Sequence, residues 1–130
     1  MSGVLVIEDD RALCRLFELM LKRDGLTAEV VQRGDDGADA IERNGDGYDA
    51  ILLDMMLPGM NGAEILSRVR STKPHLLDRI LVISAAPTQV LQAVEKDGHV
   101  RGVFRKPFDL DSVVTTLREC VRESAASRGH

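Results

Sequence analysis

Acidic side chains follow two apolar segments of the chain, at the point where each segment ends. Asp54 comes directly after the run Ala50–Leu53, and Glu8 and Asp9 come directly after the run Val4–Ile7. Such runs are typical of strands buried on both faces, and open α/β folds place their ligand sites at the carboxyl ends of such strands. Carboxylates gathered there repel one another unless a cation or a shared proton offsets the repulsion. The pattern therefore predicts a divalent metal beside a reactive aspartate.

A hydroxyl and a cation follow two further segments of the same kind. Ser84 comes after Ile80–Ile83, and Lys106 comes shortly after a weaker segment at Gly102–Phe104. Mg²⁺ prefers oxygen ligands, takes one or two protein carboxylates and completes its octahedron from water and phosphate oxygens. Catalysis of phosphoryl transfer is mostly positioning and compensation of charge by metal, ammonium and hydrogen-bond donors. We therefore expect a Mg²⁺-dependent site in which Asp54 is the nucleophile and becomes an aspartyl phosphate.

The elements that must position these side chains are repeated βα units, because short apolar runs alternate with stretches of helical period. In the second strand Glu29 indicates a sheet edge, whereas the first, third and fourth strands are expected to be buried. The predicted fold is a single doubly wound (βα)5 domain, flavodoxin-like, with a parallel sheet of order 2-1-3-4-5. This order sets the first and third strands side by side, so that Glu8, Asp9 and Asp54 would converge. The five strands are predicted at 4–7, 28–31, 50–53, 80–83 and 102–104.

Five helices are predicted between and after these strands. Asp10 and Asn61 are residue types that cap helix N-termini. After about Glu123 the chain is small and polar, so we expect one domain over 1–123 and a flexible tail over 124–130. The predicted helices are Leu13–Leu21 with a stop at Gly25, Asp35–Arg43, a third beginning after Asn61, a fourth from near Pro87 toward Asp97, and a fifth after Asp109.

Composition restricts the class of protein. The 130 residues suit one domain, and the net charge of −4 disfavours direct binding to nucleic acid. No apolar run exceeds four residues and no charged leader precedes the first strand, so we expect no membrane span, no signal peptide and a cytoplasmic protein. Cys14 and Cys120 lie in helical patterns without metal-ligand spacing and are interpreted as buried free thiols.

Four motifs in combination resemble the receiver domain of two-component response regulators, the CheY-like superfamily. The resemblance covers residues 3–123, so the expected domain over 1–123 would be a receiver domain. Each motif alone is weak, but together they are specific. They are Val-Leu-Val-Ile-Glu-Asp-Asp ending at Asp10, Leu-Leu-Asp54-Met-Met-Leu-Pro-Gly-Met-Asn-Gly62, Ile-Leu-Val-Ile-Ser84-Ala, and Lys106-Pro-Phe.

The resemblance implies a role for each site residue. Asp54 would accept a phosphoryl group from a phosphohistidine on a histidine kinase or histidine phosphotransfer protein. Asp9 and Asp54 would ligate Mg²⁺, with Glu8 acting through water and the backbone carbonyl of Met56 as the third protein ligand. Ser84 and Lys106 would bind phosphoryl oxygens, and the bond between Lys106 and Pro107 is usually cis in this family.

One position departs from the family pattern. Receivers usually carry Tyr or Phe three residues before the lysine, where the ring moves inward on activation, and this chain has Val103 there. Phe104 comes one residue later, and the alternation of side chains along a strand should point it to the opposite face. The aromatic part of the switch is therefore not expected here.

The leading hypothesis is a stand-alone receiver that signals to a downstream effector protein through a conformational change. The alternative is a phosphorylation-independent, receiver-like interaction module, favoured by Val103 and the unusual segment 98–101. An aspartate-dependent phosphohydrolase is disfavoured, because Met56 stands where such enzymes typically need a second Asp. We therefore expect no enzyme beyond a protein that catalyses its own phosphorylation and dephosphorylation.

Overall fold

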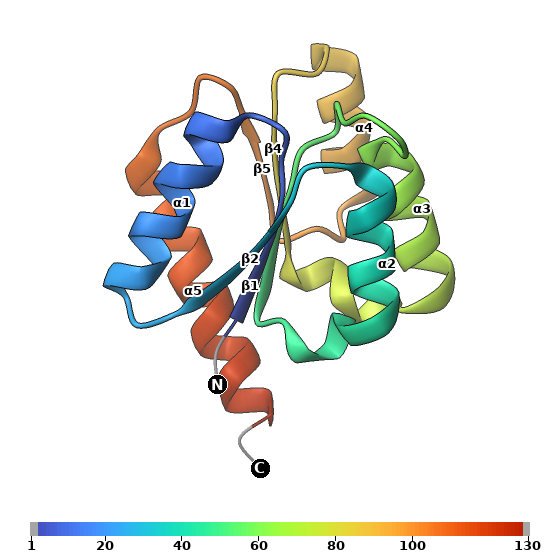
Figure 1. Cartoon of the computed structure of the whole chain (residues 1–130). Coiled ribbons are helices and arrows are strands. Elements are labelled where there is room, and N and C mark those ends of the chain that lie inside the picture. The colour runs from blue at the N-terminus through green and yellow to red at the C-terminus, as the bar shows by residue number, and fades with distance from the viewer. Residues whose placement is uncertain (1–2, 129–130) are drawn as a thin grey trace.

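Five parallel strands form one sheet in the computed structural model, which describes residues 3–128 (Figure 1). The sheet order is β2-β1-β3-β4-β5, which confirms the predicted topology and the edge position of the second strand. In the register of β1 and β3, Ile7 pairs with Leu53, so the residues that follow both strands lie at the same level. The strands are β1 (Gly3–Ile7), β2 (Thr27–Val31), β3 (Ala50–Leu53), β4 (Ile80–Ser84) and β5 (Gly102–Arg105).

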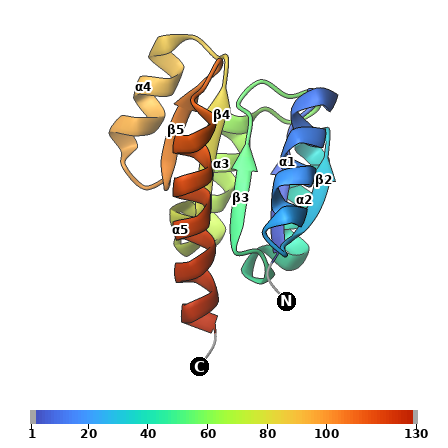
Figure 2. The same ribbon diagram turned by 90° about the vertical axis from the view of Figure 1, so that its left-hand side faces the viewer.

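Helices cover both faces of the sheet. α1 (Arg11–Arg23) and α5 (Leu110–Arg128) lie on one face, and α2 (Gly34–Asn44), α3 (Gly62–Thr72) and α4 (Thr88–Asp97) lie on the other (Figures 1 and 2). Two short 3₁₀ helices, η1 (Gly45–Gly47) and η2 (Pro74–Arg79), precede β3 and β4. β1, β3 and β4 are buried apart from Gly3 and form the centre of two cores, one on each face, as their apolar sequences predict.

The predicted caps and thiols are found in the structure. The side chain of Asp10 accepts a hydrogen bond from the backbone N–H of Leu13, and that of Asn61 accepts one from Glu64. These caps satisfy N–H groups that the first turn of a helix leaves without partners. Cys14 and Cys120 are free and buried.

The end of the chain differs from the prediction of a flexible tail over 124–130. α5 continues through residues 124–128, and residues 129–130 lie outside the described part of the chain. Ser124 is buried, and its hydroxyl donates a hydrogen bond of 2.7 Å to the backbone carbonyl of Asp49, the residue before β3. This contact with the segment that leads into β3 gives the last turns of α5 a partner that local composition could not indicate.

Val103 and Phe104 lie on opposite faces of β5, as the alternation along the strand predicts. Val103 packs against the core beneath α2, α3 and α4, whereas Phe104 packs against the core beneath α1 and α5. A Cβ on Gly102 would lie 3.0 Å from the Phe104 ring, so the absence of a side chain at Gly102 gives the ring its space. No aromatic ring from β5 therefore reaches the face that carries α4.

Candidate functional site

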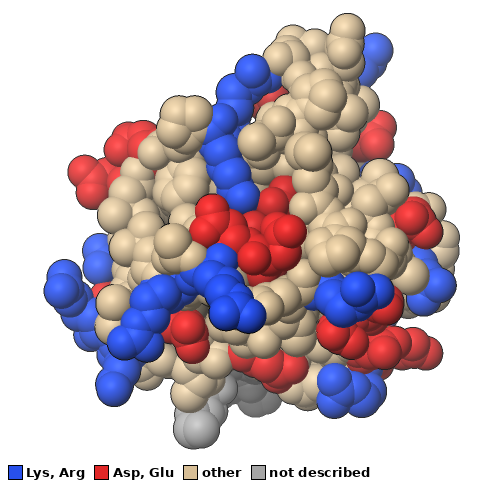
Figure 3. Space-filling view, turned by 45° about the horizontal axis from the view of Figure 1, so that its top comes forward, with Lys and Arg blue, Asp and Glu red and all other residues tan. Residues whose placement is uncertain are grey.

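The predicted acidic residues meet at the carboxyl edge of the sheet. Backbone hydrogen bonds continue one residue beyond the strands, from Asp54 N–H to Ile7 O and from Glu8 N–H to Val31 O. Glu8, Asp9 and Asp54 each offer a carboxylate oxygen within 4.8 Å of the other two. Figure 3 shows acidic side chains gathered at the centre of this face, with basic side chains on several sides of them.

Asp54 is held by three hydrogen-bond donors. Its Oδ1 accepts hydrogen bonds from the Ser84 hydroxyl at 2.7 Å and from the Met56 backbone N–H at 3.0 Å, and its Oδ2 contacts Lys106 Nζ at 3.0 Å. The carboxylate is buried. Ser84 Oγ in turn accepts a hydrogen bond from the Ala86 N–H at 3.1 Å. The predicted Ser84 and Lys106 therefore converge on the predicted acceptor.

Lys106 bridges two acidic residues that come from different strands. Its Nζ lies 2.7 Å from Glu8 Oε1 and 3.0 Å from Asp54 Oδ2, and its own backbone N–H donates to the Ser84 carbonyl at 2.9 Å. The bond between Lys106 and Pro107 is cis, as the resemblance implied. The direct ion pair with Glu8 was not foreseen from sequence, which gave Glu8 only a water-mediated contact with a metal.

The pKa values of the two buried carboxyl groups, Glu8 and Asp54, are shifted in opposite directions. Burial raises the pKa of Glu8 to about 7, although the hydrogen bond from Lys106 opposes the rise. Burial also disfavours ionisation of Asp54, but the donors on Met56, Ser84 and Lys106 outweigh it, so the pKa of Asp54 lies below its usual value. Asp54 is therefore an ionised carboxylate near neutral pH, and it shares the Lys106 ammonium with Glu8.

The donor set suits a small hard cation. Three carboxylates with one ammonium between two of them leave an excess of negative charge, and carboxylate oxygens are the ligands that Mg²⁺ prefers. Asp9 is exposed, which leaves room for the waters that Mg²⁺ retains. Met56 lies next to the site through its backbone, and its side chain is 57% exposed. The resemblance implied the Met56 carbonyl as a metal ligand, whereas the Met56 N–H as a donor to Asp54 was not foreseen from sequence.

The chain matches the sequence profile of the response regulator receiver domain family over residues 4–118. It therefore belongs to this family, whose members are the receiver domains of two-component systems. The cell cycle transcriptional regulator CtrA of Caulobacter vibrioides is 33% identical over 127 residues, which are 98% of this chain and 52% of CtrA. The response regulator ArlR of Staphylococcus haemolyticus is 31% identical over 122 residues, which are 94% of this chain and 53% of ArlR. The chain thus spans about half the length of these relatives.

Solved structures show the same fold. The receiver domain of the Francisella response regulator 1452 has a TM-score of 0.80 at 22% identity, covering 94% of this chain and 98% of that one. A CheY-like receiver domain protein from Methanospirillum hungatei has a TM-score of 0.81 at 17% identity, with 98% of both chains covered. Within residues 3–128, no helix has the length and apolar character needed to cross a membrane.

Proposed function

We propose that the protein is a phosphoacceptor receiver in which Asp54 takes a phosphoryl group in a Mg²⁺-dependent reaction. The observation that carries the proposal is the convergence of Ser84, Lys106 and the Met56 N–H on a buried, ionised Asp54. The donor of the phosphoryl group is a phosphohistidine on a histidine kinase or a histidine phosphotransfer protein. The recipient of the signal is a downstream effector protein.

The residues of the site each have a part in the transfer. An Asp54 oxygen attacks phosphorus, the bond from phosphorus to the imidazole nitrogen of the donor breaks, and the nitrogen keeps the electron pair. Lys106 and Ser84 turn from Asp54 toward the equatorial phosphoryl oxygens, where charge is spread in the transition state. Mg²⁺ held by Asp9, Asp54 and the Met56 carbonyl, with Glu8 through water, would supply charge compensation on those oxygens.

Intact-mass measurement after incubation with acetyl phosphate and Mg²⁺ tests the proposal. We expect one added phosphoryl group on the wild-type chain, and none on Asp54→Asn or in the presence of a chelator. The matched control is Asp49→Asn. Asp49 is also a buried aspartate, but it comes directly before β3, whereas Asp54 comes directly after that strand. Circular dichroism will show whether this variant is folded, and the folded variant should gain the phosphoryl group.

A phosphohistidine-bearing protein as donor extends the test, because some receivers take phosphate only from proteins. Absence of phosphorylation from both donors, together with absence of Mg²⁺ binding, would refute the proposal. The chain would then be a phosphorylation-independent interaction module, and its partner binding would be the same for wild type and Asp54→Asn.

A further inference from the structure

The loop between β3 and α3, residues 55–61, contacts the N-terminus of α2 through backbone atoms. The buried Gly34, the first residue of α2, donates its N–H to the carbonyl of Pro58 at 2.9 Å. A Cβ built on Gly34 would lie 1.4 Å from the carbonyl oxygen of Met60 and 2.5 Å from its carbonyl carbon. No side-chain rotation can relieve such an overlap, because both obstructing atoms belong to the backbone. Any side chain at position 34 must therefore displace the loop or the helix.

The same loop also borders the proposed phosphoryl site. Its residue Met56 donates the backbone N–H to Asp54 Oδ1 at 3.0 Å, and only Leu57 separates Met56 from Pro58. The base of the loop is closed by a hydrogen bond of 3.0 Å from the Gly62 N–H to the Met55 carbonyl. The overlap with Met60 and the hydrogen bond to Pro58 both fall within four residues of Met56, so a displacement of this segment passes through few residues before it reaches the atoms that contact Asp54.

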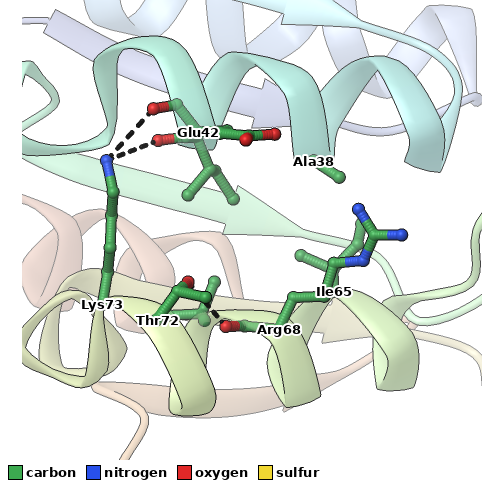
Figure 4. A pocket seen from close by; sticks show the side chains of 8 residues that line it. Ala38, Glu42, Ile65, Arg68, Thr72 and Lys73 are labelled. Carbon is green, nitrogen blue, oxygen red and sulfur yellow. Dashed lines mark hydrogen bonds between the residues drawn. The ribbon is translucent and has the colours of Figure 1, made fainter.

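Helix α2 is held at its other end, so the loop is the part that must move. Lys73 Nζ donates to the carbonyl oxygens of Ile41 and Glu42 at 3.2 Å each, which ties the last turn of α2 to the segment after α3 (Figure 4). The middle of α2 buries Ala38 and Ile41 in the core. Figure 4 shows the pocket between α2 and α3, so the side of α2 that carries Ala38 and Ile41 faces α3.

We propose that Gly34 is a positioning residue of the phosphoryl site, which fixes the place of the Met56 backbone through the loop 55–61. The inference rests on the proposed function for its consequence, because the loop matters through the metal and phosphoryl ligands it carries. Gly34 would thus support the site from outside it, at the N-terminus of α2, which contributes no ligand to the proposed metal or phosphoryl group.

The test compares Gly34→Ala with Gly45→Ala, a glycine at the opposite end of the same helix. Gly45 has an ordinary φ of −54°, and the three heavy atoms nearest to a Cβ built there all belong to side chains, the closest being Leu76 Cδ1 at 2.6 Å. Mg²⁺ dissociation constants are measured by calorimetry, and the Met56 amide resonance is followed by ¹H–¹⁵N NMR. Changes in groups that orient metal ligands typically weaken metal binding by about 10–100-fold, and we expect about tenfold weaker binding for Gly34→Ala. Gly45→Ala should stay within about twofold of wild type.

The NMR readout separates positioning from general destabilisation. Alanine is a better helix former than glycine, so helix propensity alone would favour the Gly34→Ala variant. We expect its Met56 amide to shift before any metal is added, whereas the Gly45→Ala variant keeps the wild-type shift. Wild-type Mg²⁺ affinity and an unshifted Met56 amide in folded Gly34→Ala would overturn the proposal.

A titration of the wild-type chain tests the same coupling without a variant. Binding at one site that alters another must act in both directions, so Mg²⁺ should shift the Gly34 amide, which donates to Pro58, and leave the Gly45 amide in place. A shift of Met56 without one of Gly34 would overturn the proposal. If the wild type binds no Mg²⁺ and takes no phosphoryl group, the proposed function fails. The Met56 resonance of metal-free Gly34→Ala still decides whether Gly34 positions the loop.

Discussion

Replacement of Lys106 by methionine removes the ammonium that Glu8 and Asp54 share. The two carboxylates contact Nζ at 2.7 and 3.0 Å, and their side chains are 4% and 5% exposed. Breaking a buried ion pair by removing one partner costs about 3–5 kcal/mol, because a buried charge is left uncompensated. The Lys106 side chain is itself 20% exposed, so we expect the free energy of unfolding to fall by about 2–4 kcal/mol at pH 8 without Mg²⁺.

The size of this loss should depend on pH through Glu8. Burial raises the pKa of Glu8 from 4.5 to about 7 in the folded protein, so its contribution to stability is full below pH 4.5 and is lost as the pH rises through 7. Lys106 lowers this pKa, so the pKa of Glu8 rises further in the folded variant. The variant therefore goes on losing stability above pH 7, where the wild type no longer does. The deficit relative to wild type should therefore grow by about 1.4 kcal/mol per pH unit from pH 7 upward.

Urea unfolding followed by circular dichroism measures the deficit at pH 6 and pH 8 in metal-free buffer. Lys22→Met on α1 is the matched control, because it makes the same change of charge at an exposed residue. We expect it to change stability by less than about 0.5 kcal/mol at either pH. Equal deficits for Lys106→Met at pH 6 and pH 8, or wild-type stability at pH 8, would refute the assignment of Lys106 as the partner of an ionising Glu8.

Three further predictions concern the site and the end of α5. Ser84→Ala should lower the free energy of unfolding by about 1–3 kcal/mol, because it removes a donor to a buried carboxylate, and should slow phosphorylation by acetyl phosphate by about 10²-fold in intact-mass time courses. Mg²⁺ affinity measured by calorimetry should rise up to about tenfold per pH unit toward pH 7 as Glu8 loses its proton, and Glu8→Gln should abolish that dependence. A chain ending at residue 123 should lose about 0.5–1.5 kcal/mol in urea unfolding, because it lacks the bond from Ser124 to Asp49.

Each of these three predictions has a comparison that isolates its cause. Ser84→Thr keeps a hydroxyl and should retain most of the phosphorylation rate. A chain ending at residue 126 keeps Ser124 and should match the wild type in urea. Equal stability of the two shortened chains would contradict the role given to Ser124, and a pH-dependent Mg²⁺ affinity in Glu8→Gln would assign the dependence to another group.

The strand pattern predicted that the side chains of the candidate site come together, because they follow the ends of neighbouring strands. Apolar runs predicted the strands β1, β3 and β4. The order of these strands places the residues that follow them at the same edge of the sheet. The alternation of side chains along a strand was also enough to place Val103 and Phe104 on opposite faces of β5. These features are local in sequence, or follow from the few topologies that right-handed crossovers allow.

The features that sequence did not predict depend on contacts between distant backbone atoms. Ser124 looks like part of a polar tail, and its hydroxyl donates to the carbonyl of Asp49, which lies 75 residues away in the chain. Gly34 has the sequence context of an ordinary helix start, and its contact with Pro58 and Met60 arises only when α2 and the loop after β3 are placed together. Residue type carries no signal for a contact whose other half is a carbonyl group.

The hydrogen bonds of Ser84 link the site to α4 by a route that needs no aromatic ring at position 103. Ser84 Oγ donates to Asp54 and accepts from the buried Ala86 N–H, and only Pro87 separates Ala86 from the start of α4. A hydroxyl that turns toward a phosphoryl oxygen changes the geometry of its bond with Ala86, and a buried N–H requires a partner. The backbone before α4 must then follow the hydroxyl. Val103 faces the same core without a ring to move with it, so we expect the response to phosphorylation to centre on the first turn of α4 rather than on β5.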